Sequence, residues 1–216
     1  MARPESGTGY AKPNSRALQR FYRYPHLALV SHWAFQSIFY LDPTECRFKV
    51  GLDILLTVFG ALLLGIWLPW WISWPIAFFI AHTLNFLFNG HLWGVLKHYG
   101  LVHHTHTSFK GYVDGIVNRM ATVPAIKYAV AFGSLSRGEW SAMSDLDVRL
   151  IRYSGQLNGL RACWFLMGER TRALLTGFPL DMYLLDGERS MQKLKANEHP
   201  VTLYHREDGS FPVDFT

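Results

Sequence analysis

The chain has 216 residues, of which 50% are hydrophobic and 17% charged, with a formal net charge of +5. The charged fraction lies below the roughly 25% of typical soluble domains. No Asp, Glu, Lys or Arg occurs between Ile54 and Leu96, whereas the C-terminal half has an ordinary charge density. This unevenness argues against one uniform soluble domain and indicates two different regions joined together. Two cysteines, Cys46 and Cys163, are too few for a disulfide framework and predict free thiols.

The N-terminal segment predicts little regular structure at first. Residues 1–14 are polar and rich in Gly and Pro, which is typical of a disordered tail rather than of a signal peptide. Leu18–Tyr40 then mixes aromatic residues with arginines. Such a segment either lies on a membrane surface or forms a helix packed on the C-terminal domain. We assign residues 1–49 to this tail and possible interfacial segment.

The uncharged block predicts an α-helical membrane hairpin over residues 50–96. Its two apolar runs, Val50–Leu68 and Trp70–Phe88, each approach the roughly 20 residues that cross a bilayer as a helix. The prolines and tryptophans of Pro69–Pro75 suit a turn in the interfacial belt. The alternatives are a buried helical pair in a soluble core, an apolar oligomer interface, and a re-entrant hairpin that does not cross the bilayer.

Positive residues flank the block on both sides and are absent from its turn. They are Arg16, Arg20, Arg23, Arg47 and Lys49 before it, and Lys97, Lys110, Arg119 and Lys127 after it. Because positive residues favour the cytoplasmic side, both ends of the hairpin are expected there. We therefore expect a membrane protein whose C-terminal region faces the cytoplasm.

Histidines gather around the end of the block. The cluster comprises His82, His91, His98, His103, His104 and His106. Imidazole is a good ligand for iron and zinc, and the stretch from His98 to His104 resembles the histidine boxes of membrane desaturases and hydroxylases. The boxes are incomplete here. Polar side chains facing headgroups are the other interpretation.

The C-terminal region, residues 97–216, predicts alternating helices and strands. In chain order these are a helix at Gly111–Met120, strands at Ile126–Phe132 and Asp145–Ile151, a helix at Leu157–Leu175, a strand in Phe178–Asp186, a helix at Glu188–Asn197 and a strand at Glu198–Tyr204. This order predicts an α+β fold with a mixed sheet. In the helix at Leu157–Leu175, apolar residues at helical spacing are expected to face the core: Leu157, Leu160, Cys163, Trp164, Met167 and Leu174. Arg161, Arg170 and Arg172 are expected on the opposite side.

The most informative motif joins the first two of these strands. Gly133 and Ser134 follow an apolar run, and ten residues later Asp145 and Asp147 stand at positions i and i+2. Residues two apart on a strand point to the same face, so both carboxylates can reach one cation. Mg²⁺ prefers oxygen ligands and usually sits between carboxylates and substrate phosphates. The Gly-Ser turn offers backbone N–H groups and a hydroxyl to phosphate oxygens.

The pattern Gly-Ser, ten residues, Asp-x-Asp resembles the signature of the DNA polymerase β-type nucleotidyltransferases, in their minimal single-domain branch. Arg137-Gly138-Glu139 also matches that branch, and the resemblance covers about residues 110–207. It implies a nucleotidyltransferase fold, a nucleoside triphosphate as substrate, and Mg²⁺ or Mn²⁺ as cofactor. It assigns the metal to Asp145 and Asp147, and the phosphates to Gly133, Ser134 and Arg137.

The resemblance also implies a third carboxylate on a neighbouring strand. Asp181 lies within a short apolar run, so we assign it to complete the metal site and to accept the proton of the attacking hydroxyl. Asp186 falls at the exit of that run before Gly187 and is interpreted as a turn residue. Arg149 is interpreted as a surface side chain.

Together these features predict a membrane-anchored, Mg²⁺-dependent nucleotidyltransferase. The acceptor is not specified, but a membrane anchor favours a lipid headgroup, a lipid-linked sugar or another membrane-associated acceptor. No extra nucleic-acid-binding region is evident, so a nucleic-acid partner is not expected, while a homo-oligomer is possible. The alternatives are transfer of AMP to a partner protein and a binding or scaffold protein without turnover.

Overall fold

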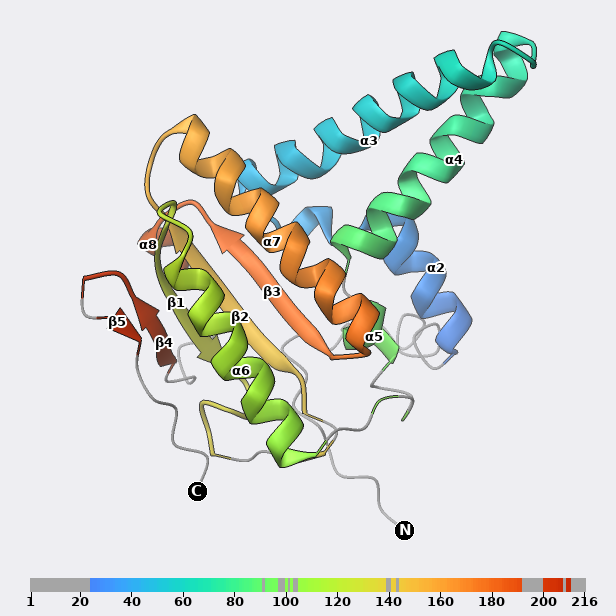
Figure 1. The fold of residues 1–216 in the computed structure, drawn as a ribbon. Helices are drawn as coiled ribbons and strands as arrows, with labels where there is room; N and C mark the ends of the chain where they lie inside the picture. Colours follow the sequence, from blue (N-terminus) through green and yellow to red (C-terminus); the bar gives the residue numbers. More distant parts are fainter. Residues whose placement is uncertain are drawn as a thin grey trace.

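The computed structural model describes residues 24–90, 92–96, 100, 102, 105–138, 141–142, 144–191, 200–207 and 209–210. The helices are α2 (Pro25–Phe35), a short 3-10 helix η1 (Ile38–Tyr40), α3 (Pro43–Leu64), α4 (Trp70–Asn89), α5 (Leu92–Leu96), α6 (His106–Ala121), α7 (Gln156–Thr176) and α8 (Glu188–Met191). The strands are β1 (Ile126–Phe132), β2 (Leu146–Arg152), β3 (Leu180–Leu185), β4 (Val201–His205) and β5 (Gly209–Ser210). The predicted α+β class is confirmed (Figure 1).

The sheet is mixed, with the strand order β3-β2-β1-β4-β5. β1 pairs antiparallel with β2 and β4, whereas β2 and β3 are parallel and are connected through α7. Parallel neighbours need such a crossover, because a tight hairpin can join only antiparallel strands. As a result, β2 and β3 begin at the same edge of the sheet, the edge at which β1 ends.

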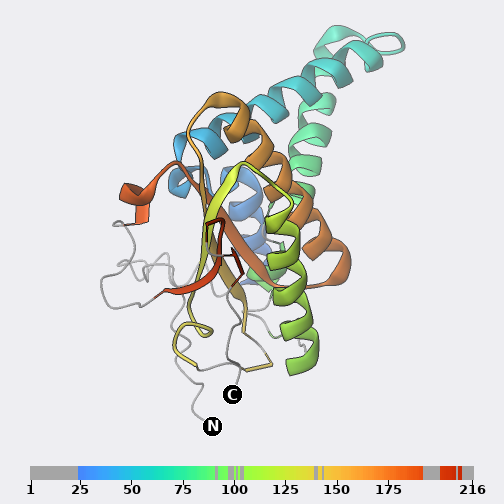
Figure 2. The ribbon, with the colours of Figure 1, turned by 60° about the vertical axis from the view of Figure 1, so that its left-hand side comes forward.

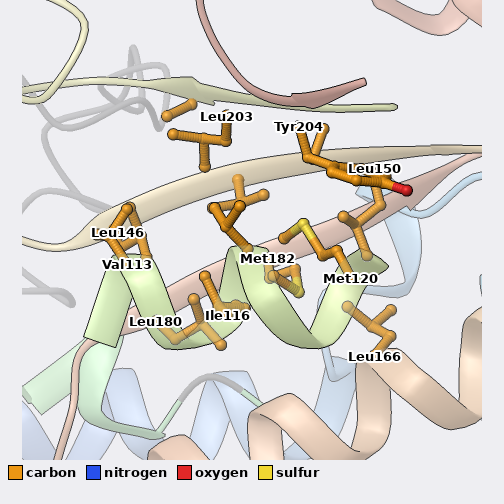
Figure 3. Close-up of a cluster of buried hydrophobic side chains, with 14 of the residues drawn as sticks. Val113, Ile116, Met120, Leu146, Leu150, Leu166, Leu180, Met182, Leu203 and Tyr204 are labelled. Atoms are coloured by element: carbon orange, nitrogen blue, oxygen red, sulfur yellow. The ribbon is translucent and has the colours of Figure 1, made fainter. Parts of the chain in front are cut away.

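One face of the sheet forms the main core. Side chains of β2 and β3 such as Val148, Leu150 and Met182 pack against Ile116 of α6 and Leu166 of α7, and all are fully buried or nearly so (Figure 3). Both helices therefore lie on the same face (Figures 1 and 2). Because side chains alternate along a strand, the residues between these core positions point to the opposite face.

α3 and α4 form a helical hairpin that extends away from the sheet (Figures 1 and 2). The two helices pack against each other through small residues, with Gly60 meeting Ala77. Their boundaries differ from the prediction. α3 begins at Pro43 and ends at Leu64, and α4 begins at Trp70 with Pro75 inside it, so the predicted turn at Pro69–Pro75 is wrong. Pro75 is the sixth residue of α4, so it lies beyond the first turn and removes the hydrogen bond that a backbone N–H there would donate to the Trp71 carbonyl.

The hairpin exposes large apolar side chains over its length. They include Ile54, Leu55, Phe59, Leu62, Leu63, Ile66, Trp67, Trp70, Trp71, Phe78, Phe79 and Ile80. Among the described residues, α4 is the one helix long and apolar enough to cross a membrane by length and composition, and 33% of its apolar window is buried. α3 carries Glu45, Arg47, Lys49 and Asp53 in its first half. We refer to these exposed apolar residues of the hairpin as its apolar sheath. A contiguous apolar surface of this kind is rare on a soluble monomer and marks a contact surface.

The foot of the hairpin, which comprises the start of α3 and the end of α4, is held against α7 and the sheet by a buried ion pair. Glu45 of α3 and Arg170 of α7 are 2.6 Å apart, and both side chains are essentially inaccessible to solvent. Glu45 also accepts a hydrogen bond from the backbone N–H of Leu184, and Arg170 donates to Asn89 at the end of α4. β3 is an edge strand of the described sheet, and Glu45 accepts a hydrogen bond from its outer side, where a further strand would pair in a longer sheet.

This arrangement corrects the predicted orientation of α7. Arg170, expected on the outer side, is among the most buried residues, whereas Leu157, Leu160 and Trp164, expected in the core, are exposed. Cys163 is buried as expected, and the rest of the buried face comprises Gly159, Ala162, Leu166, Glu169, Arg170 and Ala173. α7 therefore carries apolar residues on both its outer and its inner face, so their spacing alone does not show which face is buried.

The remaining N-terminal segment packs beside the hairpin. The indole N–H of Trp33 in α2 donates a hydrogen bond to Thr83, and the backbone carbonyl oxygen of Trp33 lies 2.9 Å from His82 Nε2. The other ring nitrogen of His82 lies 2.7 Å from Asp53. α2 therefore packs on α4 of the hairpin, a contact that neither interpretation of this segment specified. Cys46 and Cys163 are free, as predicted.

Several predictions fall on parts of the chain that lie outside the described residues. These are residues 1–23, His91, His98, His103, His104, Glu139, positions 192–197 of the helix expected at Glu188–Asn197 and positions 198–199 of the strand expected at Glu198–Tyr204. The part of that helix that is described is α8, Glu188–Met191.

Candidate active site

Two of the predicted carboxylates lie opposite each other on adjacent parallel strands. The register pairs Asp147 of β2 with Asp181 of β3, one position from the start of each strand. Both follow a buried leucine, Leu146 and Leu180, which points to the helix-covered face. Alternation therefore places both carboxylates together on the other face of the sheet, about 5 Å apart at the backbone.

Asp145 directly precedes β2 and joins this pair electrostatically. Burial raises the pKa of Asp147 well above its ordinary value, and the negative charges of Asp145 and Asp181 raise it further. A hydrogen bond between the side chains of Asp147 and Asp181 acts in the same direction, while Arg149 opposes it. Three carboxylates so close together repel one another when ionised, so this cluster favours a cation or a shared proton.

The Gly133-Ser134 turn lies against the same cluster. Gly133 has a φ of +73°, and a Cβ at this position would collide with Asp147 Oδ2, so the close approach and the left-handed backbone both require glycine. Ser136 Oγ donates to the Gly133 carbonyl and steadies the turn. The turn at the end of β1 thus brings the Gly133 backbone into contact with the Asp147 carboxylate.

Ser134 presents an unused hydroxyl at this turn. Its Oγ is buried and, within the part of the chain that the structure describes, has no hydrogen-bond partner. A buried hydroxyl in this state costs about 1–3 kcal/mol. A phosphate oxygen entering the turn would accept its hydrogen bond. Arg137, three residues later, has an exposed side chain.

Arg149 belongs to the site, which corrects its interpretation as a surface residue. Its Nη1 donates to the carbonyl oxygens of Val148 and Asp181, and its Nη2 lies 3.8 Å from Asp181 Oδ2. The guanidinium carbon is 4.5 Å from the centre of the Tyr183 ring. The sequence does contain a signal for this position, because Arg149 is two residues after Asp147 and must share its face of the sheet.

His32 of α2 is a second residue near the site that the sequence did not indicate. Burial lowers the pKa of His32, and the negative charge of Asp181 acts against this effect, so the ring lies within electrostatic range of that carboxylate. His32 also lines a small cavity with Lys49 and Phe86 at the foot of the hairpin. The carboxylate cluster and the foot of the hairpin are therefore neighbours.

Asp186 is not a turn residue satisfied by local contacts. Its Oδ1 accepts from Arg152 Nε at 2.9 Å and its Oδ2 accepts from the backbone N–H of Thr44 at 3.1 Å. Although burial acts in the opposite direction, these hydrogen bonds lower its pKa below the ordinary value. Asp186 thus ties the start of α3 to the end of β3, and this role is structural.

The donor set fits a hard divalent cation shared with a substrate. Among the described residues, no three His, Cys, Asp or Glu side chains are gathered tightly enough to hold a metal ion. Mg²⁺ does not require such a cage, since it is usually held by one or two carboxylates plus substrate phosphates and water. Asp145, Asp147 and Asp181 supply carboxylates beside a turn with a free hydroxyl donor. That combination suits a metal-bound triphosphate better than a metal bound by protein alone.

Of the clustered histidines that the structure describes, His82 contacts Asp53 within the hairpin and His106 opens α6. These two histidines lie on different helices, α4 and α6. Comparison of the chain with protein-family models, with curated proteins and with solved structures gives no significant match. The resemblance to nucleotidyltransferases therefore depends on the motif residues and their arrangement.

Proposed function

We propose that the chain is a membrane-anchored, Mg²⁺-dependent nucleotidyltransferase that moves a nucleoside monophosphate from a nucleoside triphosphate to an acceptor. The observation that supports this most strongly is the pairing of Asp147 with Asp181 across parallel strands, with Asp145 and the Gly133-Ser134 turn beside them. Mutual repulsion of these carboxylates is relieved by the cation that accompanies a triphosphate.

Each residue of the candidate site has a separate role in this proposed reaction. Ser134 Oγ and the backbone of the turn bind phosphate oxygens, and Asp145 and Asp147 hold the cation. When bound, Mg²⁺ neutralises charge on the phosphates and on the departing pyrophosphate. Asp181 accepts the proton of the attacking hydroxyl, and Arg149 fixes the backbone and side chain of Asp181. The attacking oxygen forms a bond to the α-phosphorus as the bond to pyrophosphate breaks.

The hairpin supports a membrane location for this chemistry. α4 has 20 residues, about 30 Å as a helix, which matches the hydrocarbon core of a bilayer. Exposed tryptophans at its tip, including Trp67, Trp70 and Trp71, match an interfacial belt. β3, the strand that begins beside Asp181, contacts the start of α3 through the hydrogen bond from the Leu184 N–H to Glu45. An acceptor held at the membrane surface, such as a lipid headgroup or lipid-linked sugar, is therefore within reach, and the positive flanks put this surface on the cytoplasmic side.

Pyrophosphate release tests this function. Purified protein in detergent is incubated with each nucleoside triphosphate, Mg²⁺ and a lipid extract, and released pyrophosphate is measured. We expect Mg²⁺-dependent release that Asp181→Asn abolishes while nucleotide binding is kept, because Asp145 and Asp147 still hold the cation. Asp114→Asn, an exposed carboxylate on α6, is the matched control. Turnover that persists in Asp181→Asn at the wild-type rate contradicts the mechanism.

A further inference from the structure

The outer face of α7, defined by Leu157, Leu160, Arg161 and Trp164, has the composition of a surface that touches lipid headgroups. Leu157, Leu160 and Trp164 are 59%, 47% and 51% exposed, and Arg161 is exposed between them. Within the described residues Arg161 makes no ion pair. Tryptophan and leucine beside a free arginine are typical of helices that lie in the membrane interface.

α7 crosses the foot of the hairpin and does not run alongside it. Near its start, Gly159 packs on Thr44 and Trp164 packs edge-on against Phe48 at 5.5 Å, both at the beginning of α3. Near its end, Arg170 donates to Asn89 and Thr171 donates to the Phe88 carbonyl, at the end of α4. The beginning of α3 and the end of α4 are the two points where the hairpin joins the rest of the molecule (Figure 1).

Because α7 crosses the foot of the hairpin, the depth of the foot along the bilayer normal also sets the depth of α7. From foot to tip the hairpin measures about 30 Å, the thickness of the hydrocarbon core. When the tip reaches the far interface, the foot lies at the near interface, and α7 lies there with it. The outer face of α7 is also continuous with the apolar sheath of the hairpin, because Trp164 contacts Phe48 and exposed Val50 and Ile54 follow along α3.

Charge complementarity favours lipid over another occupant. Arg47 stands next to Phe48 on the exposed side of α3 and, like Arg161, has no ion-pair partner among the described residues. Two unpaired cations flanking an apolar strip match anionic headgroups, each worth about 1 kcal/mol near such a surface. A second copy of the chain would bring the same arginines close to each other and is disfavoured for that reason.

We propose that the outer face of α7 is a second membrane-contact surface that rests on the headgroups of an anionic leaflet. This proposal rests on the membrane anchor of the proposed function. The hairpin holds the protein in the bilayer, and α7 sets the tilt of the catalytic part. Because Asp181 follows shortly after α7 in the chain, the same contact holds the carboxylate cluster at a fixed height above the headgroups.

Site-directed spin labelling tests the proposal. Single cysteines are introduced by Leu160→Cys on α7, Phe59→Cys on the hairpin and Asn118→Cys on the exposed side of α6, in full-length chains whose Cys46 and Cys163 are replaced by alanine. The labelled proteins are reconstituted in vesicles of phosphatidylcholine with 30% phosphatidylglycerol, or of phosphatidylcholine alone. Accessibility of each label to oxygen, which concentrates in lipid, is compared with accessibility to a water-soluble nickel chelate.

We expect the labels at positions 160 and 59 to be more accessible to oxygen than to the chelate, and the label at 118 to show the reverse. The preference at 160 should weaken in vesicles without phosphatidylglycerol, whereas the one at 59 should not. A label at 160 that behaves as at 118, with 59 still in lipid, overturns this proposal and leaves the anchor intact. Water exposure at both 160 and 59 overturns both. Low accessibility to both reagents at 160 indicates a protein partner and also overturns the proposal.

Discussion

The hairpin and the sheet distribute polarity in opposite ways. The hairpin exposes Ile54, Phe59 and Trp67 and buries Glu45 and Asn85, whereas the sheet and α6 bury their large apolar residues and leave carboxylates at one edge. One chain cannot satisfy both arrangements in a single solvent, because exposed apolar area and buried charge each carry a free-energy cost in water. The contrast supports the proposal that the hairpin lies in lipid and the sheet in water, with the foot and its polar contacts at the boundary.

The largest effect is expected where the two regions meet. Glu45→Ala leaves the guanidinium of Arg170 buried without its charge partner and the N–H of Leu184 without an acceptor, so we expect a loss of about 3–5 kcal/mol in the free energy of unfolding. Denaturant unfolding in detergent, followed by tryptophan fluorescence, measures this loss. The control is Glu188→Gln, which removes the exposed ion pair with Lys127 and should change stability little. Equal effects of the two substitutions would show that the foot does not connect the regions energetically.

A charge on the hairpin separates its surroundings from those of the sheet. Phe59 is 67% exposed in the second half of α3, within the uncharged part of the hairpin. Phe59→Lys should weaken membrane insertion by at most about 2.5–3.5 kcal/mol, the cost of a lysine at the centre of a spanning helix. Flotation with vesicles after carbonate washing measures insertion, and Asn118→Lys on α6 is the matched control. Undiminished flotation of Phe59→Lys would mean that the apolar sheath faces something other than lipid.

The smallest effect concerns the second connection at the foot and depends on pH. The folded protein lowers the pKa of Asp186 below its ordinary 3.8, so its ionised form stabilises the fold above that value. This contribution is lost as pH falls through the lowered pKa. Asp186→Asn should cost about 1 kcal/mol at neutral pH, since it weakens the bonds to Arg152 and Thr44. Melting temperatures of the two proteins should converge below about pH 4, and a gap independent of pH would contradict this assignment.

Local patterns predicted much of the sheet and of the carboxylate cluster. The apolar runs around Gly133 and Asp147 specify strands within one or two residues of β1 and β2, and the position of Asp181 inside a short apolar run specifies β3. These signals lie within a few residues of the positions they describe. Their chemical roles remain predictions, because arrangement alone does not show turnover.

Contacts between distant parts of the chain could not be predicted in the same way. Arg170 was expected outside because its partner, Glu45, is 125 residues away in the sequence. Asp186 is held by Thr44, 142 residues away. A helix with apolar residues on two sides, as in α7, does not reveal which side meets the sheet until the neighbouring helices are known. The sequence therefore predicted which strands carry the carboxylates, but not the contacts at the foot of the hairpin.

The central claim is that the carboxylates at the start of β2 and β3 hold a divalent cation together with a nucleoside triphosphate. Because the acceptor is not specified, cation binding tests this claim more directly than turnover. Mn²⁺, which reports its binding by electron paramagnetic resonance, is titrated into the full-length protein with a non-hydrolysable nucleoside triphosphate analogue. We predict nucleotide-dependent Mn²⁺ binding that Asp147→Asn weakens at least about tenfold and Asp114→Asn leaves unchanged. Equal Mn²⁺ affinity in the wild type and in Asp147→Asn would contradict the account.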